Sequence, residues 1–293
     1  MATRVAMFVA GRGTNLTTEM TTSGGTTHAA AIQQRFDELE SFAPDGVTVV
    51  QTDRDDPREE QLRVLREADA IVACFAAGPG GTGCGELIME LLPQLTRLRL
   101  VQLLSSGYDE YFSADDVVRL DRAGVTVANN GGANAAAVSE TAVALAFAVH
   151  RGLVEMVNHV QRGEWRWDAL RPGTELTGLT VGVVGFGNVG RQVARKMGGG
   201  FDCPVLFYDT DELPIGRAAE LGAHAAPLDE LLGRADIVVL CVPGIPATER
   251  LIGEKELGLM KPSAILVNVS RVSSHSLSPD PFSPTSPLCL LHH

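Results

Sequence analysis

The feature that most constrains the fold is a glycine pattern that directly follows an apolar strand, in the run Val181-Gly-Val-Val-Gly-Phe-Gly-Asn-Val-Gly190. Gly185, Gly187 and Gly190 have the G-x-G-x-x-G spacing of a strand–turn–helix unit that binds a dinucleotide. The first glycine permits a tight turn, the second lets a pyrophosphate approach the backbone, and the third lets helix and strand pack closely. The free N–H groups of the helix start favour phosphate. The predicted cofactor contacts in this loop are Gly185, Gly187, Asn188, Val189 and Gly190.

An acidic residue at the end of the next predicted strand strengthens this interpretation. Asp209 lies 209 − 190 = 19 residues after the third glycine, and the fingerprint requires an acid about 20 residues on to accept the ribose hydroxyls. Taken alone, Asp209 would be read as a helix cap. Asp211 and Glu212 add negative charge where the 2′-phosphate of NADP would lie, and the next basic residue is Arg217. The sequence therefore predicts NAD rather than NADP as the cofactor.

The first half of the chain alternates apolar strand patterns with helical patterns. Near-continuous apolar strands separated by helices are typical of a parallel sheet that is covered on both faces. The predicted strands are Val5–Ala10, Val47–Gln51, Ala70–Phe75, Leu98–Leu104 and Val125–Asn129. The predicted helices are Ala29–Phe42, Pro57–Glu67, Gly85–Leu95 and Ala114–Arg122. We therefore expect one five-stranded α/β unit.

The second half has the same pattern and predicts a second doubly wound unit. Its predicted strands are Thr180–Val184, Pro204–Tyr208, Ile237–Val242 and Ala264–Val269. Its predicted helices are Asn188–Met197, Ile215–Leu221, Leu228–Leu232 and Glu254–Met260. A length of 293 residues fits two domains of about 150 residues each, and we expect them at residues 1–127 and 128–271. Residues 272–293 are rich in serine and proline, which predicts a disordered tail.

Charge and cysteine content exclude some classes of partner. The net charge is −12, and a negative field repels phosphate, so we expect neither nucleic acid nor an anionic membrane as a partner. Cys74 and Cys241 lie inside apolar runs, and the chain has no CxxC pair. This usage is typical of reduced thiols in a cytoplasmic protein. No apolar run is long enough to span a membrane, and we expect no metal ion in the site.

From about Leu98 to Arg271 the sequence resembles the D-2-hydroxyacid dehydrogenases, whereas residues 1–97 match only in pattern. Several motifs in the same order carry the resemblance: Ser105-Ser-Gly107-Tyr-Asp109, Gly124-Val-Thr-Val-Ala-Asn129, Asn134 to Glu140, Glu175-Leu-Thr-Gly178, Val242-Pro243 with Thr248, and Asn268-Val-Ser-Arg271. The resemblance implies a flavodoxin-like substrate domain, a Rossmann NAD-binding domain, and NAD-linked conversion between a 2-hydroxy acid and a 2-keto acid.

The resemblance also implies roles for individual residues. Arg271 matches the catalytic arginine, whose planar guanidinium can hold a carboxylate and polarise the adjacent carbonyl; the alternative is a solvated arginine at a strand end. Ser106 and Gly107 match the loop whose N–H groups bind the substrate carboxylate; the alternative is a plain turn. The remaining residues implied to contact the cofactor are Val242, Pro243, Thr248, Val269 and Ser270.

The sequence leaves the family pattern at Val272, where glycine is usual. The family's acid/base histidine and its carboxylate follow the arginine, and none of the seven histidines here has a matching context. We therefore expect an end that is truncated or altered, a Rossmann unit that lacks its last strands, and impaired activity. The alternatives are an inactive NAD-binding module, a truncated gene-model product, and a non-redox enzyme such as a lyase.

The helix predicted over Asn134–Val149 is apolar nearly all round, which is typical of a helix that is buried on every side. The resemblance implies that a second copy of the chain covers one of its faces, so that the protein is a homodimer. Burial between the two domains of one chain is the alternative.

Overall fold

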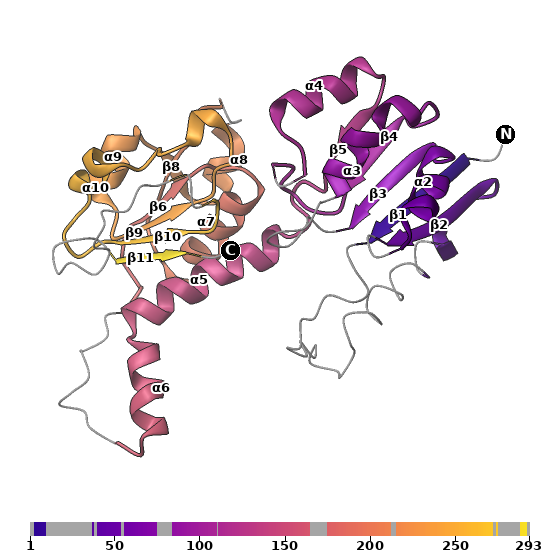
Figure 1. Cartoon of the computed structure of the whole chain (residues 1–293). Helices are drawn as coiled ribbons and strands as arrows, with labels where there is room; N and C mark the ends of the chain where they lie inside the picture. The colour runs from indigo at the N-terminus through magenta and orange to yellow at the C-terminus, as the bar shows by residue number, and fades with distance from the viewer. Residues whose placement is uncertain are drawn as a thin grey trace. The chain divides into compact units, whose positions relative to one another are not determined.

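The structure is a computed structural model that describes residues 3–9, 37, 40–53, 56–74, 84–109, 111–164, 175–211, 215–271, 274 and 288–291. The chain forms two compact units, Met1–Gly131 and Gly132–His293 (Figure 1). The boundary expected from the sequence, after residue 127, lies 131 − 127 = 4 residues before this division.

The first unit contains a parallel sheet whose five strands lie in the order β2-β1-β3-β4-β5. This is the flavodoxin-like order of a doubly wound sheet, as the sequence predicts. The strands are β1 (Thr3–Val9), β2 (Val47–Asp53), β3 (Ala70–Cys74), β4 (Leu100–Leu103) and β5 (Thr126–Ala128). The helices are α2 (Arg58–Arg66), α3 (Cys84–Leu91), the 3-10 turn η1 (Leu92–Gln94) and α4 (Ala114–Arg122). Most of the helix expected over Ala29–Phe42 lies outside the described residues; Asp37 and residues 40–42 are helical.

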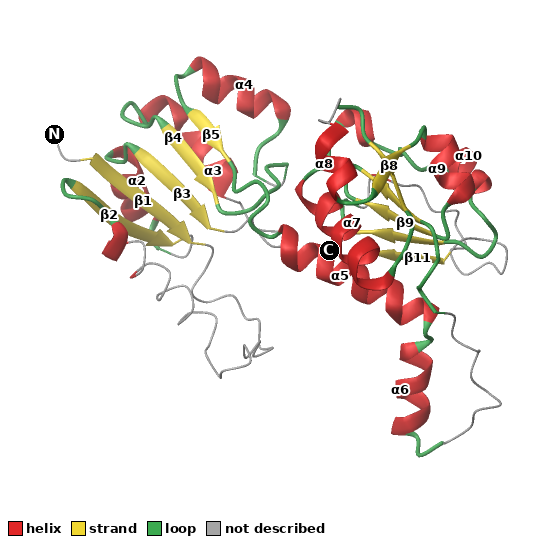
Figure 2. Cartoon of the chain, turned by 180° about the vertical axis from the view of Figure 1, so that it is seen from behind, coloured by secondary structure: helices red, strands yellow, loops and turns green. Residues whose placement is uncertain are grey.

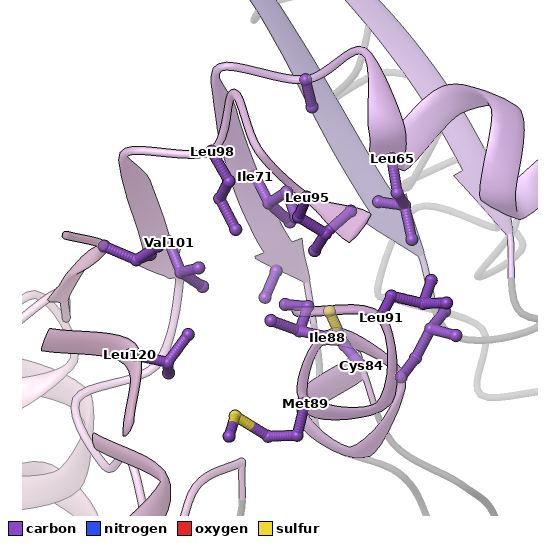
Figure 3. Close-up of a cluster of buried hydrophobic side chains, with 14 of the residues drawn as sticks. Leu65, Ile71, Cys84, Ile88, Met89, Leu91, Leu95, Leu98, Val101 and Leu120 are labelled. Atoms are coloured by element: carbon purple, nitrogen blue, oxygen red, sulfur yellow. The ribbon is translucent and has the colours of Figure 1, made fainter. Parts of the chain in front are cut away.

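The core of the first unit forms where the helices meet the sheet. Leu65 of α2, Ile88 of α3 and Leu120 of α4 are completely buried, together with Ile71 of β3. Figure 3 shows these side chains in one apolar cluster. Because α4 is mostly polar, its start also depends on capping: the Ser113 hydroxyl accepts a hydrogen bond from the backbone of Asp116, and the Asp116 carboxylate accepts one in return.

The second unit contains a parallel sheet of six strands in the order β11-β10-β9-β6-β7-β8. Counted along the chain, this is the Rossmann order, in which the glycine-rich turn follows the first strand. The strands are β6 (Val181–Val184), β7 (Val205–Tyr208), β8 (Ala223–Ala225), β9 (Ile237–Leu240), β10 (Ile265–Asn268) and β11 (Leu288–Leu291). The helices are α5 (Ala135–His150), α6 (Leu153–Gln161), α7 (Asn188–Phe201), α8 (Ile215–Glu220), α9 (Leu228–Arg234), the 3-10 turn η3 (Pro246–Thr248) and α10 (Glu254–Leu259).

The predicted disorder of residues 272–293 is wrong for Ser274 and for Leu288–Leu291. Ser274 is buried, and Leu288–Leu291 forms β11, which pairs in parallel with β10. This strand occupies the sixth position of the Rossmann order, for which the sequence predicts no strand. The prolines of the tail end at Pro287, and the apolar run that follows them is free to extend a sheet edge. The average composition of the tail therefore predicted disorder even though its last residues include a short strand.

Two apolar layers enclose the sheet of the second unit. Val183 and Val267 face a layer that includes Ala142 of α5 and Val193 of α7. Val184 and Leu266 face the opposite layer, which includes Leu231 of α9. Successive strand residues alternate between the two layers, and both are buried, as in a doubly wound sheet. The β6 strand that leads into the glycine loop is thus fixed from both sides.

Helix α5 packs through one stripe rather than through all its faces. Its fully buried residues are Ala135, Ser139, Ala142 and Ala146, whereas Ala136, Ala137 and Ala144 are exposed. Within this unit the helix is therefore buried along one stripe only, and burial of its other faces by a second copy or by the first unit stays a prediction. Among the described residues no single helix is long and apolar enough to cross a membrane. Helices α5 and α6, which meet at a bend of 67°, together have the length and apolar composition of a span.

Candidate functional site

The glycine loop after β6 has the three distinct environments that a dinucleotide fingerprint requires. Gly185 has a φ of +88°, and a Cβ there would lie 2.7 Å from the carbonyl oxygen of Cys241. A Cβ on Gly190 would lie 2.1 Å from the carbonyl oxygen of Gly185. A Cβ on Gly187 would meet no atom within 4 Å. Two glycines therefore serve the protein's own packing, and the third leaves open space at the start of α7.

Asp209 lies directly beside this loop. Its Oδ2 accepts a hydrogen bond of 2.6 Å from the backbone N–H of Phe186, and its Oδ1 accepts one of 3.1 Å from the N–H of Asp211. The Phe186 ring is buried and stacks on Phe207 of β7 with a centroid separation of 4.0 Å. The carboxylate and the glycine loop therefore form one assembly, although 23 residues separate Asp209 from Phe186. Asn188, which begins α7, accepts a hydrogen bond from Arg191, and Val189 packs against the core.

The loops after β9 and β10 are hydrogen-bonded to each other. The N–H of Val242 donates to the Ser270 hydroxyl at 2.8 Å. The Thr248 hydroxyl donates to the carbonyl of Pro243 at 2.5 Å and accepts from the N–H of Ile245 at 3.2 Å, which closes the turn η3. Because β6, β9 and β10 are adjacent and parallel, both loops lie at the same sheet edge as the glycine loop. Val269 packs against the apolar core on the α5 and α7 side.

Arg271 lies at this edge, three residues beyond the end of β10, and its side chain is partly buried. Its Nη1 donates to the carbonyl of Ser270 at 3.1 Å. Its own carbonyl accepts hydrogen bonds from Asn268 Nδ2 at 2.9 Å and from Ser274 Oγ at 2.6 Å. The second unit thus brings the predicted cofactor residues and the predicted catalytic arginine to one edge of one sheet.

Ser106 and Gly107 belong to the first unit, in the loop after β4. The carbonyl of Ser106 accepts a hydrogen bond of 2.8 Å from Asn129 Nδ2, and its hydroxyl donates to the carbonyl of Asn130 at 3.1 Å. The Ser105 hydroxyl donates to the carbonyl of Gly107 at 2.6 Å. Sequence reasoning missed the role of the Asn129 amide. Its position just after β5 is the one available signal, since polar residues at the ends of adjacent parallel strands meet.

The described histidines lie on other elements than the loops that carry Arg271 and the glycine fingerprint. His150 ends α5, His159 lies on α6, and His224 lies on β8. Burial lowers the pKa of His150, and the charge of Asp236 partly opposes this shift. His28, His275, His292 and His293 lie outside the described residues.

Burial also raises the pKa of the Cys241 thiol to about 12. The thiol next to the glycine loop is therefore neutral at physiological pH, which argues against a thiolate nucleophile at this position.

Comparisons with known proteins agree with this geometry. Residues 143–276 match the family model for the NAD binding domain of D-isomer specific 2-hydroxyacid dehydrogenases. The glyoxylate reductase of Thermococcus gammatolerans is 36% identical over 231 residues, and the alignment covers 77% of this chain and 65% of that protein. The glyoxylate/hydroxypyruvate reductase B of Pectobacterium atrosepticum is 33% identical over 222 residues, which cover 73% of this chain and 68% of that protein.

The chain belongs to the D-isomer-specific 2-hydroxyacid dehydrogenase family. Solved structures share its fold. A glyoxylate reductase from Paecilomyes thermophila has a TM-score of 0.68 at 23% identity, with coverage of 94% of this chain and 76% of that one. A D-lactate dehydrogenase from Aquifex aeolicus, complexed with NAD and lactic acid, has a TM-score of 0.66 at 23% identity, with coverage of 92% and 70%. As a member of this family, the chain carries its NAD-binding domain in the second unit.

Proposed function

We propose that this 2-hydroxyacid dehydrogenase family member interconverts a small 2-keto acid and its 2-hydroxy acid with NAD as the redox partner. One observation carries the proposal: the glycine loop, Asp209 and Arg271 lie at one edge of one parallel sheet. Glyoxylate and hydroxypyruvate are the first substrates to test, because two relatives are named for their reduction. The first unit would be the substrate domain.

The loop residues fit a dinucleotide. The open space at Gly187 and the N–H groups at the start of the 14-residue helix α7 suit a pyrophosphate. Asp209 is held beside the loop by two backbone hydrogen bonds, and its remaining acceptor capacity suits the ribose hydroxyls. When bound, NAD accepts or supplies the hydride. The carboxylates of Asp209 and Asp211 would repel a 2′-phosphate, which favours NAD over NADP.

Arg271 and the loop of Ser106 and Gly107 would act on the substrate. A guanidinium can hold a carboxylate through two parallel hydrogen bonds and can stabilise negative charge on the carbonyl oxygen. In the first unit, backbone N–H groups of the Ser106–Gly107 loop are suited to bind a carboxylate. Arg271 cannot supply the proton, because a guanidinium stays protonated throughout the physiological pH range. The proton must therefore come from another group, and a positioned general acid typically contributes about 10²–10⁴-fold to the rate.

The first test measures NADH binding by fluorescence and NADH oxidation with glyoxylate, hydroxypyruvate and pyruvate. We expect NADH to bind, at least one of the keto acids to be reduced, and Arg271→Ala to abolish this reduction while NADH binding is retained. Arg234→Ala is a suitable control, because Arg234 is an exposed helix residue paired with Glu230. A chain that binds no NADH would overturn the proposal, and so would a keto-acid rate that Arg271→Ala leaves unchanged.

The second test concerns the choice of cofactor. We expect the chain to bind NADH at least about tenfold more tightly than NADPH, since one charged hydrogen bond contributes about 1.5–3 kcal/mol. Asp209→Ala should weaken NADH binding and narrow this difference, whereas Asp209→Asn should retain the acceptor for the N–H of Phe186. Equal affinity of the original chain for the two cofactors, measured by calorimetry, contradicts the assignment.

The proposal includes a cytoplasmic homodimer. The sequence predicts that a partner covers one face of α5, and the exposed apolar residues of the adjacent helix α6 extend this surface. Helix α6 projects from the sheet of its unit in both views (Figures 1 and 2) and has no buried residue. Its exposed apolar residues are Leu153, Val154, Met156, Val157 and Val160. Light scattering should give twice the chain mass, and Val157→Glu should shift it to the monomer; a monomer throughout refutes this part.

A further inference from the structure

The buried side chain of Asn268 forms hydrogen bonds with the backbone at and next to Arg271. Asn268 is 1% exposed and ends β10. Its Oδ1 accepts a hydrogen bond of 2.8 Å from the N–H of Ser270. Its Nδ2 donates at 2.9 Å to the carbonyl of Arg271 and at 3.0 Å to the hydroxyl of Ser274. One side chain therefore holds the segment on both sides of Arg271.

Ser274 holds the same segment from its C-terminal side. It is 1% exposed, and its hydroxyl donates to the carbonyl of Arg271 at 2.6 Å while it accepts from Asn268. Its backbone carbonyl accepts a hydrogen bond of 3.2 Å from the N–H of Ile252, which is completely buried. The turn that carries Arg271 is thus attached to the segment after η3, as well as to Val242 through the Ser270 hydroxyl.

The chemistry of this cluster is specific to the residues present. An asparagine amide offers both an acceptor and two N–H donors, and here all of these are used. Aspartate in the same place would present only acceptors when ionised and would face the Arg271 carbonyl unfavourably. Because the groups are buried, a donor or acceptor left without its partner costs about 1–3 kcal/mol. The arrangement therefore tolerates few substitutions.

We propose that Asn268 and Ser274 are positioning residues that fix the backbone of Arg271, so that its guanidinium meets a substrate carboxylate in a defined orientation. The inference rests on the proposed function, in which Arg271 binds that carboxylate. Ser274 follows Val272, the position where the sequence leaves the family pattern. The altered segment therefore supplies one half of this cluster, and the family motif, through Asn268, supplies the other.

The test measures the binding of oxamate, a 2-keto acid isostere, to the chain saturated with NADH, so that it needs no turnover. Ser274→Ala removes one hydrogen bond to the Arg271 carbonyl and should weaken oxamate binding about 3–10-fold, in line with a net loss of roughly 1 kcal/mol. Asn268→Asp, which has the same shape, should weaken it further. The affinity for NADH should stay within about twofold of the original value in Ser274→Ala.

A double-variant comparison separates positioning from general stability. Arg271→Ala should weaken oxamate binding strongly, and Ser274→Ala added to it should cause no further loss, because both act through the same guanidinium. If Ser274→Ala weakens oxamate binding equally in both backgrounds, or weakens NADH binding to the same degree, the inference is wrong. If Arg271→Ala itself leaves oxamate binding unchanged, the proposed role of Arg271 fails. Absence of oxamate binding by the original chain with NADH bound overturns both.

Discussion

Two loops at the carboxyl ends of parallel strands are held in place by opposite means. The loop Gly185–Gly190 in the second unit depends mainly on the absence of side chains, because the backbone approaches itself and Cys241 too closely for a Cβ. The loop Ser105–Gly107 in the first unit depends on side chains, through the hydroxyls of both serines and the amide of Asn129. A loop that excludes side chains can be recognised in the sequence by its glycine pattern, whereas a loop held by side-chain hydrogen bonds cannot.

The difference follows from where the stabilising partners lie in the sequence. The carbonyl of Gly185, only five residues away, leaves no room for a side chain at Gly190. This steric constraint therefore lies within one short sequence motif. Ser106 is held by residues 23 and 24 positions away, on the loop after the neighbouring strand. Short-range constraints of this kind can be inferred from residue spacing. Long-range constraints become apparent only once the strand order is known.

The largest expected effect tests the loop that excludes side chains. In Gly190→Ala the new Cβ would lie 2.1 Å from the carbonyl oxygen of Gly185, so β6 or α7 must shift. We expect a loss of about 3 kcal/mol in the free energy of unfolding of the second unit, at the upper end of the effects of overpacking. Urea denaturation measures this loss, and NADH fluorescence should show that binding is abolished.

Gly187→Ala is the matched control, because no atom lies within 4 Å of its added Cβ and the φ of Gly187 is −72°. Its stability should change by less than about 1 kcal/mol, while NADH affinity falls if a pyrophosphate lies against the loop. Equal stability of Gly190→Ala and the original chain would remove the basis of the comparison between the two loops.

The sequence allowed the parts of the fold that depend on local pattern to be predicted. The strands of both sheets, apart from β8 and β11, and the helix of the fingerprint were expected near their observed positions. β8 was missed because Ala223–Ala225 is short and has no β-branched residue. β11 was missed because it follows a proline-rich stretch. Helix α6 was missed because it is only nine residues long and follows α5 after a break of two residues.

In the candidate site, too, only the residues that belong to a local sequence pattern could be predicted. Gly185, Gly190 and Asp209 were expected from spacing, and the structure brings them together. The roles of Asn268 and Ser274 were not visible, because a buried asparagine that binds three nearby backbone and side-chain groups has no recognisable sequence pattern. Ser274 was further obscured because it lies in a segment whose composition indicates disorder. Hydrogen-bond networks of this kind require coordinates.

A smaller effect is expected at the loop that is held by side chains. Asn129→Ala removes the donor to the carbonyl of Ser106, and because Asn129 is exposed, water can replace part of the lost bond. We expect oxamate binding in the presence of NADH to weaken about twofold to fivefold, corresponding to roughly 0.5–1 kcal/mol, with unchanged NADH affinity. Asn158→Ala, an exposed asparagine on α6, is the control and should change neither value. A tenfold or larger loss of NADH affinity in Asn129→Ala would contradict the assignment of this loop to the substrate.

The smallest effect concerns a position where the backbone requires glycine and the sequence has arginine. Arg250, two residues after η3, has a φ of +51°, in the left-handed region that costs a residue with a Cβ about 1–2 kcal/mol. Arg250→Gly removes this strain, but glycine gives up about 0.5–1 kcal/mol of that gain through the greater entropy of the unfolded chain. We therefore expect a net stabilisation of roughly 0.5 kcal/mol, or about 1–2 °C in the melting temperature. Arg250→Ala serves as the control: it removes the same side-chain contacts and retains the strain, so it should not stabilise the unit. If both variants lower the melting temperature equally, the contacts of the Arg250 side chain stabilise the unit by more than the backbone strain destabilises it. In that case a positive φ in these loops does not by itself identify a position suited to glycine.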